Sequence, residues 1–427
     1  MITAILNARV LDPATNTDTI GGAIIDSGKI AAWGTGVKAA PGGADQIIDA
    51  GGLCLAPGLI DLRVKTGEPG EEHRETLETA SRAALSGGVT QFVVMPDTTP
   101  VIDDVALIQF LTRDTPGVSA RIHAAGALTT GLGGTAMAEI GLMKEAGAVF
   151  FTNGDHPIED AAIHRRTMAY ATSHGAIVAS RPDTASLRGS GVMNAGSFAA
   201  RLGLKGIPGE AEWIGAARDL MLAEATGCRL IVDQVSSPRT LDLITEARQR
   251  GVEAGCTVAA HALFFNELDV GDYLTYCKVN PPFRSEADRQ GLIAALAAGE
   301  IDAVVSAHDP QPPEQKRLPF AEASFGAAGL ETTLAAVLHS VHDGPLDLLD
   351  ALRVLTCGPA DLIGLEGGRL AEGAPADLIL FDPDRPWKCE RENLITRSTN
   401  SPFDGRLLQG RVMRTFVEGR TVFERDA

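Results

Sequence analysis

The sequence lacks most of the features that mark secreted, membrane-spanning or nucleic-acid-binding proteins. Its six cysteines occur singly, without a CxxC pair, so neither a zinc knuckle nor a disulfide framework is indicated. Basic residues number 37 against 55 acidic ones, and a formal net charge of −18 makes nucleic acid and anionic membranes poor partners. No apolar run approaches the roughly 20 residues that span a bilayer. The segment from Met1 to Arg9 also lacks the build of a signal peptide, so we expect a cytoplasmic protein.

The composition is that of a folded protein with frequent turns. Hydrophobic residues make up 44% of the 427 residues, which excludes a disordered chain. The 47 glycines exceed average usage, which is about 7%. The length is sufficient for one large barrel domain with a smaller companion.

The two ends of the chain resemble each other and differ from the middle. At each end, two short apolar segments flank a turn, Ser27-Gly28 near the start and Glu418-Gly419 near the finish. Ala376–Phe381 is one further strand candidate. We therefore predict a small β-sandwich domain assembled from residues 1–56 and 365–427.

The middle of the chain alternates short apolar runs with longer helical patterns, which is typical of βα units and a parallel sheet. Eight such units predict an α/β fold, a (β/α)8 TIM-type barrel over residues 57–364. An open doubly wound sheet is the alternative, but the Gly-rich phosphate loop expected after its first strand is missing. The eight predicted strands are Leu55–Lys65, Val89–Pro96, Arg121–Leu128, Gly147–Asn153, Gly175–Arg181, Cys228–Val235, Cys256–Leu263 and Ile301–Asp309.

Several motifs resemble those of the dihydroorotases, a family of the amidohydrolase superfamily. Residues 55–70 resemble the first barrel strand of that family, and Lys278–Arg284 (Lys-Val-Asn-Pro-Pro-Phe-Arg) resembles a family-specific marker. The likeness covers almost the whole chain, with the motifs in the same order. Further matching segments are Gly87–Thr90, Val94–Asp97, Gly191–Asn194, Gly203–Pro208, Ile301-Asp302, Gly329–Thr332 and Gly373–Pro383.

The resemblance implies a barrel with a β-sandwich made from both termini, which agrees with the reading of the residues themselves. It also implies metal-assisted opening of dihydroorotate to carbamoyl aspartate, a step of pyrimidine biosynthesis. In such enzymes zinc generates hydroxide near neutral pH and polarises the ring carbonyl. That chemistry needs imidazoles and carboxylates at the strand ends.

The positions that match the metal ligands of the family carry none of its strong zinc ligands. Arg63 and Lys65 stand at the two positions of His-x-His, where their positive charges would repel a divalent cation. The remaining degenerate metal positions are Asn153, Ser180, Gln234 and Ala307, the last of them matching the aspartate that is both ligand and general base. We therefore predict no metal site, no catalytic residue and no bound cofactor.

The substrate positions have changed as well. Gly67 matches the family's carboxylate-binding arginine, and Asp97 matches an asparagine whose replacement by a carboxylate would repel an anionic substrate. Asn280 and His308 are retained pocket residues.

The two introduced cations admit two interpretations. Arg63 and Lys65 could point into solvent. The sharper hypothesis places their charges in the space of two zinc ions, where they neutralise carboxylates such as Asp61 or Asp97.

The resemblance implies a role without catalysis. Degenerate dihydroorotase homologues of bacteria accompany aspartate transcarbamoylase and are needed to assemble its complex. We therefore expect a pseudo-dihydroorotase that is a structural or regulatory subunit for the aspartate transcarbamoylase catalytic chain, in homo- and hetero-oligomers. Two alternatives stay open: a zinc-dependent cyclic amidohydrolase with a relocated site at His261, His308 and Asp309, or a binding module in which Arg63 and Lys65 hold an anionic metabolite of the pathway.

Overall fold

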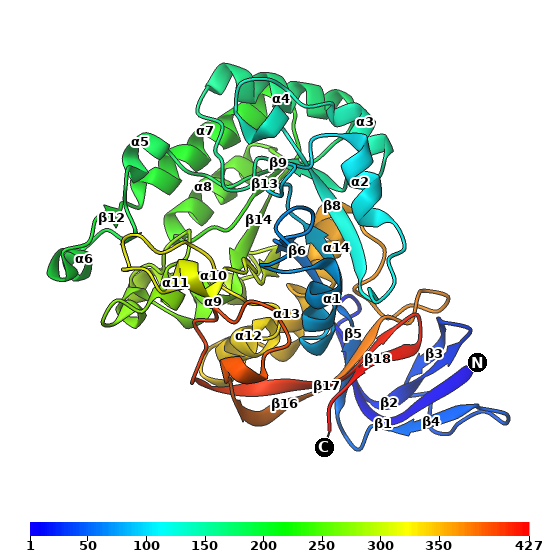
Figure 1. Cartoon of the computed structure of the whole chain (residues 1–427). Coiled ribbons are helices and arrows are strands. Elements are labelled where there is room, and N and C mark those ends of the chain that lie inside the picture. Colours follow the sequence, from blue (N-terminus) through cyan, green and yellow to red (C-terminus); the bar gives the residue numbers. More distant parts are fainter. Residues whose placement is uncertain (427) are drawn as a thin grey trace.

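The computed structural model describes residues 1–426, and its centre is a barrel of eight parallel strands (Figure 1). Each strand pairs with the next along the chain, and an isolated parallel bridge between Val64 and His308 brings the last strand beside the first. The predicted (β/α)8 barrel is therefore confirmed. Its strands are β6 (Leu59–Val64), β7 (Val89–Val94), β8 (Arg121–Ala127), β9 (Phe150–Thr152), β10 (Val178–Ser180), β13 (Leu230–Val232), β14 (Ala254–Ala259) and β15 (Ala303–Val305).

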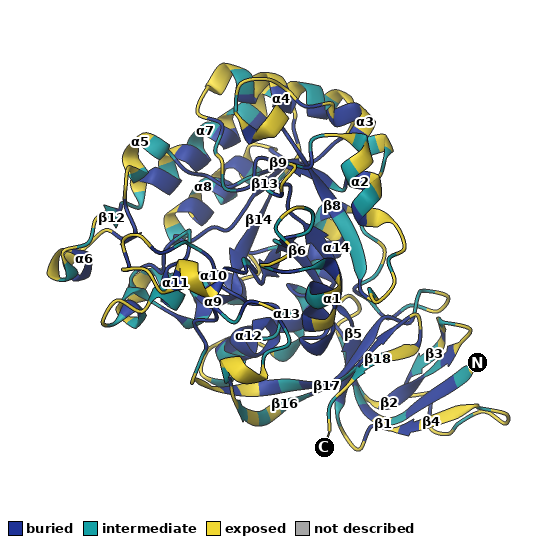
Figure 2. Ribbon diagram, viewed as in Figure 1, coloured by how far each residue is buried: buried dark blue, intermediate teal, exposed yellow. Residues whose placement is uncertain are grey.

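Helices cover the outside of the barrel and bury one face against it (Figure 2). The first of them, α1 (Leu77–Ser86), starts at a capping box in which Thr76 and Thr79 satisfy each other's backbone amides, and it buries Leu77, Ala80 and Ala84. The other helices are α2 (Val105–Thr112), α3 (Ile140–Glu145), α4 (Ala161–Ser173), α7 (Glu210–Thr226), α8 (Pro238–Gln249), α9 (Ala260–Phe264), α10 (Glu286–Ala297), α11 (Pro313–Lys316), α12 (Thr333–His342), α13 (Leu348–Arg353) and α14 (Cys357–Ile363).

Both ends of the chain contribute strands to a separate sheet beside the barrel (Figure 1). The strand order is β18-β17-β16-β5-β1-β2-β3, with β4 on β1, and the sheet encloses an apolar core of its own that includes Ile5, Ile25 and Phe416. The strands are β1 (Ile2–Asp12), β2 (Thr17–Asp26), β3 (Lys29–Gly34), β4 (Gln46–Asp49), β5 (Cys54–Pro57), β16 (Leu378–Lys388), β17 (Leu407–Val417) and β18 (Arg420–Glu424).

Two of the predicted barrel strands need correction. Leu55–Lys65 is not one strand, because β5 pairs in the terminal sheet and β6 in the barrel. Gly58 separates them where a Cβ would collide with the side chain of Thr90. Cys256–Leu263 is also divided, since the strand ends at Ala259 and the rest is helix α9.

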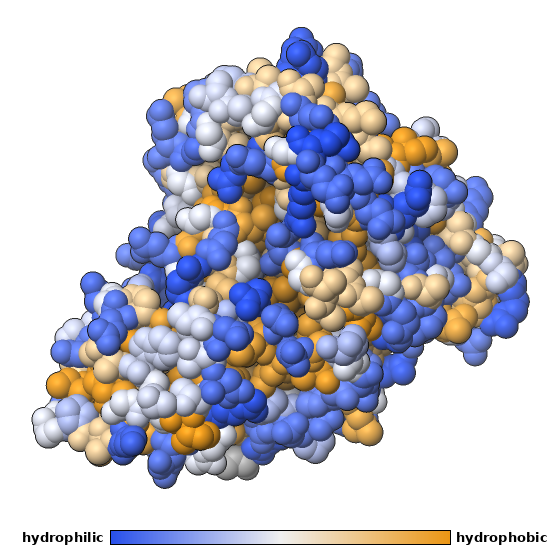
Figure 3. Space-filling view, turned by 180° about the vertical axis from the view of Figure 1, so that it is seen from behind, coloured by the Kyte–Doolittle hydropathy of each residue, from blue (hydrophilic) through white to orange (hydrophobic). Residues whose placement is uncertain are grey.

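A short arm leaves the barrel between β10 and α7. It consists of α5 (Ala185–Arg188), β11 (Met193–Asn194), α6 (Ser197–Leu202) and β12 (Gly206–Ile207), and α6 lies at its outer end (Figure 1). Seen from behind, polar and charged side chains cover most of the molecule, with smaller hydrophobic areas between them (Figure 3). Within residues 1–426, every helix is too short or too polar to pass through a lipid bilayer.

Candidate functional site

The carboxyl ends of the barrel strands meet at one mouth, which is where barrel enzymes carry their active sites. Arg63 lies on β6, and Lys65 follows it directly. Their side chains are only 3% and 15% exposed, so both point into the protein. The interpretation that they point into solvent is therefore wrong.

The guanidinium of Arg63 is held by two carboxylates from neighbouring strand ends. One Nη pairs with Asp233 after β13, and the other lies 2.7 Å from Asp155 after β9. Thr257 donates a hydrogen bond of 2.7 Å to the second oxygen of Asp233. Burial lowers the pKa of Arg63, but the carboxylates outweigh it and raise the pKa above its ordinary value.

The ammonium of Lys65 has three acidic neighbours. Its Nζ pairs with Asp155 and lies 2.7 Å from Asp97 and 3.3 Å from Asp309. Burial lowers the pKa of Lys65, and the same three carboxylates more than compensate, so the pKa is raised and the group stays charged.

Asp155 joins the two cations and is the centre of the network. It also lies 3.2 Å from the Nε of Arg181. Burial raises the pKa of a carboxyl group, but Lys65, Arg181 and Arg63 outweigh it, so the pKa of Asp155 lies well below its ordinary value. Sequence reasoning missed Asp155, although a carboxylate shortly after a predicted barrel strand was a usable signal.

Two further carboxylates lie near the two cations. Asp309 is 14% exposed and contacts Arg74 at 3.2 Å in addition to Lys65. Asp61 does not pair with either cation, since its carboxylate accepts the backbone amides of Arg63 and Ser306. Burial raises the pKa of Asp61 to about 6. The hypothesis of charge neutralisation thus agrees with the contact to Asp97, and not with Asp61.

The space left at the mouth is a cavity of about 20 Å³. A cavity of that size holds about one water molecule, whereas pockets for small organic ligands measure roughly 300–1,000 Å³. His261, Asn280 and His308 line it together with Arg63 and Lys65. Burial lowers the pKa of His261 to about 4, so this imidazole is neutral at physiological pH.

His308 is held by the barrel rather than directed at a ligand. Its Nδ1 accepts the backbone amide of Gly329, and its Nε2 lies 3.5 Å from the carboxylate of Glu75. Burial raises the pKa of Glu75, but His308 outweighs it and the pKa is lowered.

The other degenerate positions make structural contacts. The amide of Asn153 bonds to Thr129, and the Ser180 hydroxyl donates to Asp219 at 2.6 Å. Gly67 lies where a Cβ would collide with a backbone carbonyl, so a side chain does not fit there.

The backbone at two former ligand positions has an unusual conformation. Gln234 and Ala307 have φ angles of 55° and 51°, a left-handed region that costs energy for residues other than glycine. Both residues follow barrel strands, so the strained backbone lies at the same mouth as Arg63 and Lys65.

The mouth does not fit a zinc ion. Two cations with buried side chains, Arg63 and Lys65, lie at the end of β6, and within the described part of the chain no three His, Cys, Asp or Glu side chains are grouped to hold a metal. The nearby carboxylates are already paired with Arg63, Lys65 and Arg181.

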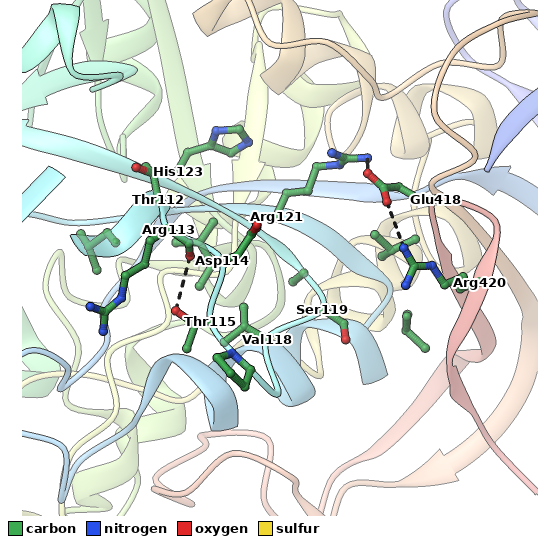
Figure 4. Close-up of a pocket in the computed structure, with 16 residues that line it drawn as sticks. Thr112, Arg113, Asp114, Thr115, Val118, Ser119, Arg121, His123, Glu418 and Arg420 are labelled. Carbon is green, nitrogen blue, oxygen red and sulfur yellow. Dashed lines mark hydrogen bonds and ion pairs between the residues drawn. The ribbon is translucent and has the colours of Figure 1, made fainter. Parts of the chain in front are cut away.

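A wider cavity, of about 670 Å³, lies at the opposite end of the barrel. It opens beside the start of β8 and the turn between β17 and β18, where Arg121 reaches Glu418 and Glu418 reaches Arg420 (Figure 4). Barrel enzymes do not place their chemistry at this end.

Comparisons with known proteins agree with this architecture. Residues 52–239 match a family model described as dihydro-orotase-like, and residues 334–423 match one described as the amidohydrolase family. The dihydroorotase of Desulforapulum autotrophicum is 41% identical over 90% of this chain and 92% of its own. That of Syntrophotalea carbinolica is 39% identical over 98% of both chains.

Among solved structures, the L-hydantoinase (dihydropyrimidinase) of Arthrobacter aurescens superposes with a TM-score of 0.88 at 26% identity, covering 99% of this chain and 96% of the other. A D-hydantoinase, at 22% identity and a TM-score of 0.83, shares the fold. The chain belongs to the dihydroorotase family of amidohydrolases.

Proposed function

We propose that this chain is a non-catalytic dihydroorotase homologue that acts as a structural or regulatory subunit for aspartate transcarbamoylase. The absence of catalysis is inferred from the ion-pair network at the barrel mouth. Arg63 and Lys65 stand where the family places two metal-binding imidazoles, and each is paired with carboxylates of other strand ends.

The volume of the mouth supports the same conclusion. Dihydroorotate is far larger than a water molecule, and the cavity measures about 20 Å³. Opening it would require breaking several buried ion pairs, and removing one partner of such a pair leaves an uncompensated charge. The side chains therefore fill the space that a substrate would need.

The partner in the proposal comes from the resemblance to degenerate homologues that accompany aspartate transcarbamoylase. The retained fold is consistent with a role that depends on shape, since a fold by itself does not confer activity. The motif Lys278–Arg284 supports this view, because Arg284 binds Asn194 and Ile207 of the arm and thereby fixes its position.

The absence of catalysis is tested on the purified full chain after zinc supplementation. We expect close to no tightly held metal per chain by elemental analysis. We also expect no turnover of dihydroorotate or carbamoyl aspartate above the blank, while a dihydroorotase with an intact His-x-His pair turns over under the same conditions. One or two firmly bound zinc ions together with turnover would overturn the proposal.

The partner is tested separately. The chain and the aspartate transcarbamoylase of the same genome, mixed at micromolar concentration, should elute together in size-exclusion chromatography. Separate elution would refute the subunit role and leave the absence of catalysis untouched.

One observation favours a second candidate, a cyclic amidohydrolase with a relocated site. His261, His308 and Asp309 line the same cavity, and relatives at 36–41% identity carry the name dihydroorotase. This candidate requires bound metal that is lost in His308→Asn. The binding-module hypothesis has less support, because Arg63 and Lys65 already have carboxylate partners.

A further inference from the structure

A cavity of about 100 Å³ lies between the terminal sheet and the helices of the barrel. Its walls include the ends of β16 and β17 and the first turn of α12, which packs against β17 (Figure 1). Within residues 1–426 it shares no lining residue with the barrel mouth, so it is a separate site. The volume exceeds that of one water molecule and is smaller than the roughly 300–1,000 Å³ of pockets for whole organic ligands.

Three arginines of the terminal sheet gather at this cavity. Arg411 on β17 and Arg425 after β18 line it. Arg385 on β16 lies near both, because its Nη1 donates to the sulfur of Met413 at 3.5 Å and the Met413 carbonyl accepts the amide of Arg425. Within residues 1–426 none of the three arginines forms an ion pair. In a chain with a net charge of −18, a cluster of cations without carboxylate partners is unexpected.

Arg411 shows most clearly that a partner is missing. Its guanidinium lies over the ring of Trp387, 4.5 Å from the ring centre. Its Nε is buried and, in the part of the chain that the structure describes, has no hydrogen-bond acceptor. Burial, together with the like charges of Arg425 and Arg385, lowers the pKa of Arg411 to about 10. A buried donor without an acceptor costs free energy, and a bound acceptor would remove that cost.

Two carboxylates line the cavity, and both are bound elsewhere. Glu331 accepts two backbone amides of the loop between β16 and β17, at 2.8 and 3.0 Å. Glu390 pairs with Lys388 at 3.1 Å. Glu331 attracts Arg411 from a distance, but its effect is smaller than the repulsion from the two neighbouring arginines. The cavity therefore keeps an excess of positive charge.

The first turn of α12 adds to this positive potential. The helix begins at Thr333, and within residues 1–426 no side chain caps its N-terminus. Leu334 and Ala335 of the first turn line the cavity. The unpaired amides at the start of a helix carry partial positive charge and favour an anion.

We propose that this cavity binds a phosphate group, either as the free ion or as the phosphoryl end of a larger molecule that extends into solvent. Three guanidinium groups and a helix N-terminus favour a ligand with more than one negative charge and several acceptor oxygens. A phosphate group has both, whereas a carboxylate has one charge and two oxygens. The planar donors of arginine also match the geometry of phosphate. The proposal depends neither on the barrel mouth nor on the partner proposed above.

Calorimetric titration of the full chain with inorganic phosphate tests the site. At about 0.15 M sodium chloride, where the field of surface charges extends only about 8 Å, we expect one phosphate per chain. Arg411→Gln should weaken binding by about tenfold or more, because a charge-assisted hydrogen bond is lost. The matched control is Arg420→Gln, which removes the same charge at an exposed position of β18 that lines the 670 Å³ cavity instead. Absence of binding to the wild type, or equal weakening by the control, would overturn the proposal.

Thermal unfolding provides a second readout. Phosphate should raise the unfolding temperature of the wild type and of Arg420→Gln, and should have little effect on Arg411→Gln or Arg425→Gln. If the latter two variants unfolded at lower temperature but bound phosphate as tightly as the wild type, the arginines would be structural and the proposal would be wrong.

A phosphate monoester distinguishes the two sources of the phosphate group. Ribose 5-phosphate that binds at least as tightly as inorganic phosphate, and that Arg411→Gln weakens equally, would assign the site to the phosphoryl end of a larger molecule. Weaker binding of the ester would assign it to the free ion.

Discussion

A single buried arginine holds several strand ends of this barrel together. Substitution of Arg63 by methionine removes its charge. Asp233 is then buried without a cationic partner, and Asp155 loses one of its cationic neighbours. Breaking a buried pair in this way costs roughly 3–5 kcal/mol. We therefore expect Arg63→Met to lower the free energy of unfolding by about that amount, measured by urea denaturation at pH 7.

The matched control for this change is Arg9→Met. Arg9 also pairs with a carboxylate at 2.7 Å, but both side chains of the Arg9–Asp18 pair are 40% exposed. Surface pairs of this kind contribute about 1 kcal/mol or less. If Arg63→Met and Arg9→Met lost equal amounts of unfolding free energy, burial would not be what strengthens the ion pairs at the barrel mouth.

The raised pKa of Asp61 determines the direction in which its contribution to folding stability changes with pH. Its pKa is raised by burial from 3.8 to about 6, so the folded state binds its proton more tightly than the unfolded state. The contribution of Asp61 to stability is therefore fully present below about pH 4 and declines as the pH rises towards 6. The shift corresponds to about 3 kcal/mol.

The measurement compares the wild type with Asp61→Asn by urea denaturation at several pH values between 4 and 7. Other carboxylates, including Asp155 with its lowered pKa, change stability in the opposite direction but are common to both chains. The free energy of unfolding of the wild type, relative to that of Asp61→Asn, should fall by up to about 3 kcal/mol as the pH rises from 4 to 7. A difference independent of pH would show that Asp61 ionises equally in both states.

At the scale of single elements, the sequence predicts the barrel well because βα alternation is a local pattern. Its errors lie where the pattern does not distinguish two structures. The apolar run from Ala259 through Leu263 fits a buried strand as well as a helix, and the chain forms helix α9 there. The largely apolar segment from Leu55 to Val64 was predicted as one strand, but it forms two consecutive strands that belong to different sheets.

The loss of the family's metal ligands could be predicted from the sequence, but the ion-pair network at the barrel mouth could not. The residues at the six ligand positions can be read directly, but the partners of Arg63 and Lys65 come from four other strand ends. Asp97, Asp155 and Asp233 are far apart in the sequence, and only the closure of the barrel brings them together. A count of carboxylates that follow barrel strands would have been the best available signal.

A buried cation, Arg284, helps to hold the arm in its position. Arg284 donates to Asn194 at 3.1 Å and to the carbonyl of Ile207 at 3.0 Å, and its Nε donates to Ser236 at 2.9 Å. Glu212 is buried beside it and binds the same serine. The arm therefore has a fixed attachment at both of its short strands.

We expect Arg284→Met to release the arm while the barrel stays folded. Residues 184–209 should then exchange backbone amide hydrogens faster, measured by hydrogen–deuterium exchange with mass spectrometry. Arg201→Met is the control, because Arg201 is exposed on the arm and stacks on Phe198 without crossing to the barrel. Unchanged exchange in Arg284→Met would mean that the other contacts of the arm, including the hydrogen bonds of Asn194 to Glu267 and of Tyr273 to Leu202, hold it without Arg284.

At the scale of the whole molecule, the terminal sheet and the barrel share a hydrophobic core. One continuous cluster joins barrel residues such as Phe92 to sheet residues such as Phe381 and Val412. Thr415 on β17 also donates a hydrogen bond of 2.7 Å to the carbonyl of Leu85 at the end of α1. These contacts favour unfolding of both parts in a single transition.

The six cysteines report on this cooperativity, because all are buried and they are distributed over both parts. Burial raises the pKa of Cys54 in the terminal sheet to about 11 and that of Cys256 in the barrel to about 12, so neither reacts readily as a thiolate. We expect a disulfide reagent such as DTNB to leave the native chain almost unlabelled at pH 7.5 and to modify all six thiols in one phase at the rate of global unfolding. Faster labelling of Cys54 and Cys389, abolished by serine at both positions, would instead show that the terminal sheet opens on its own.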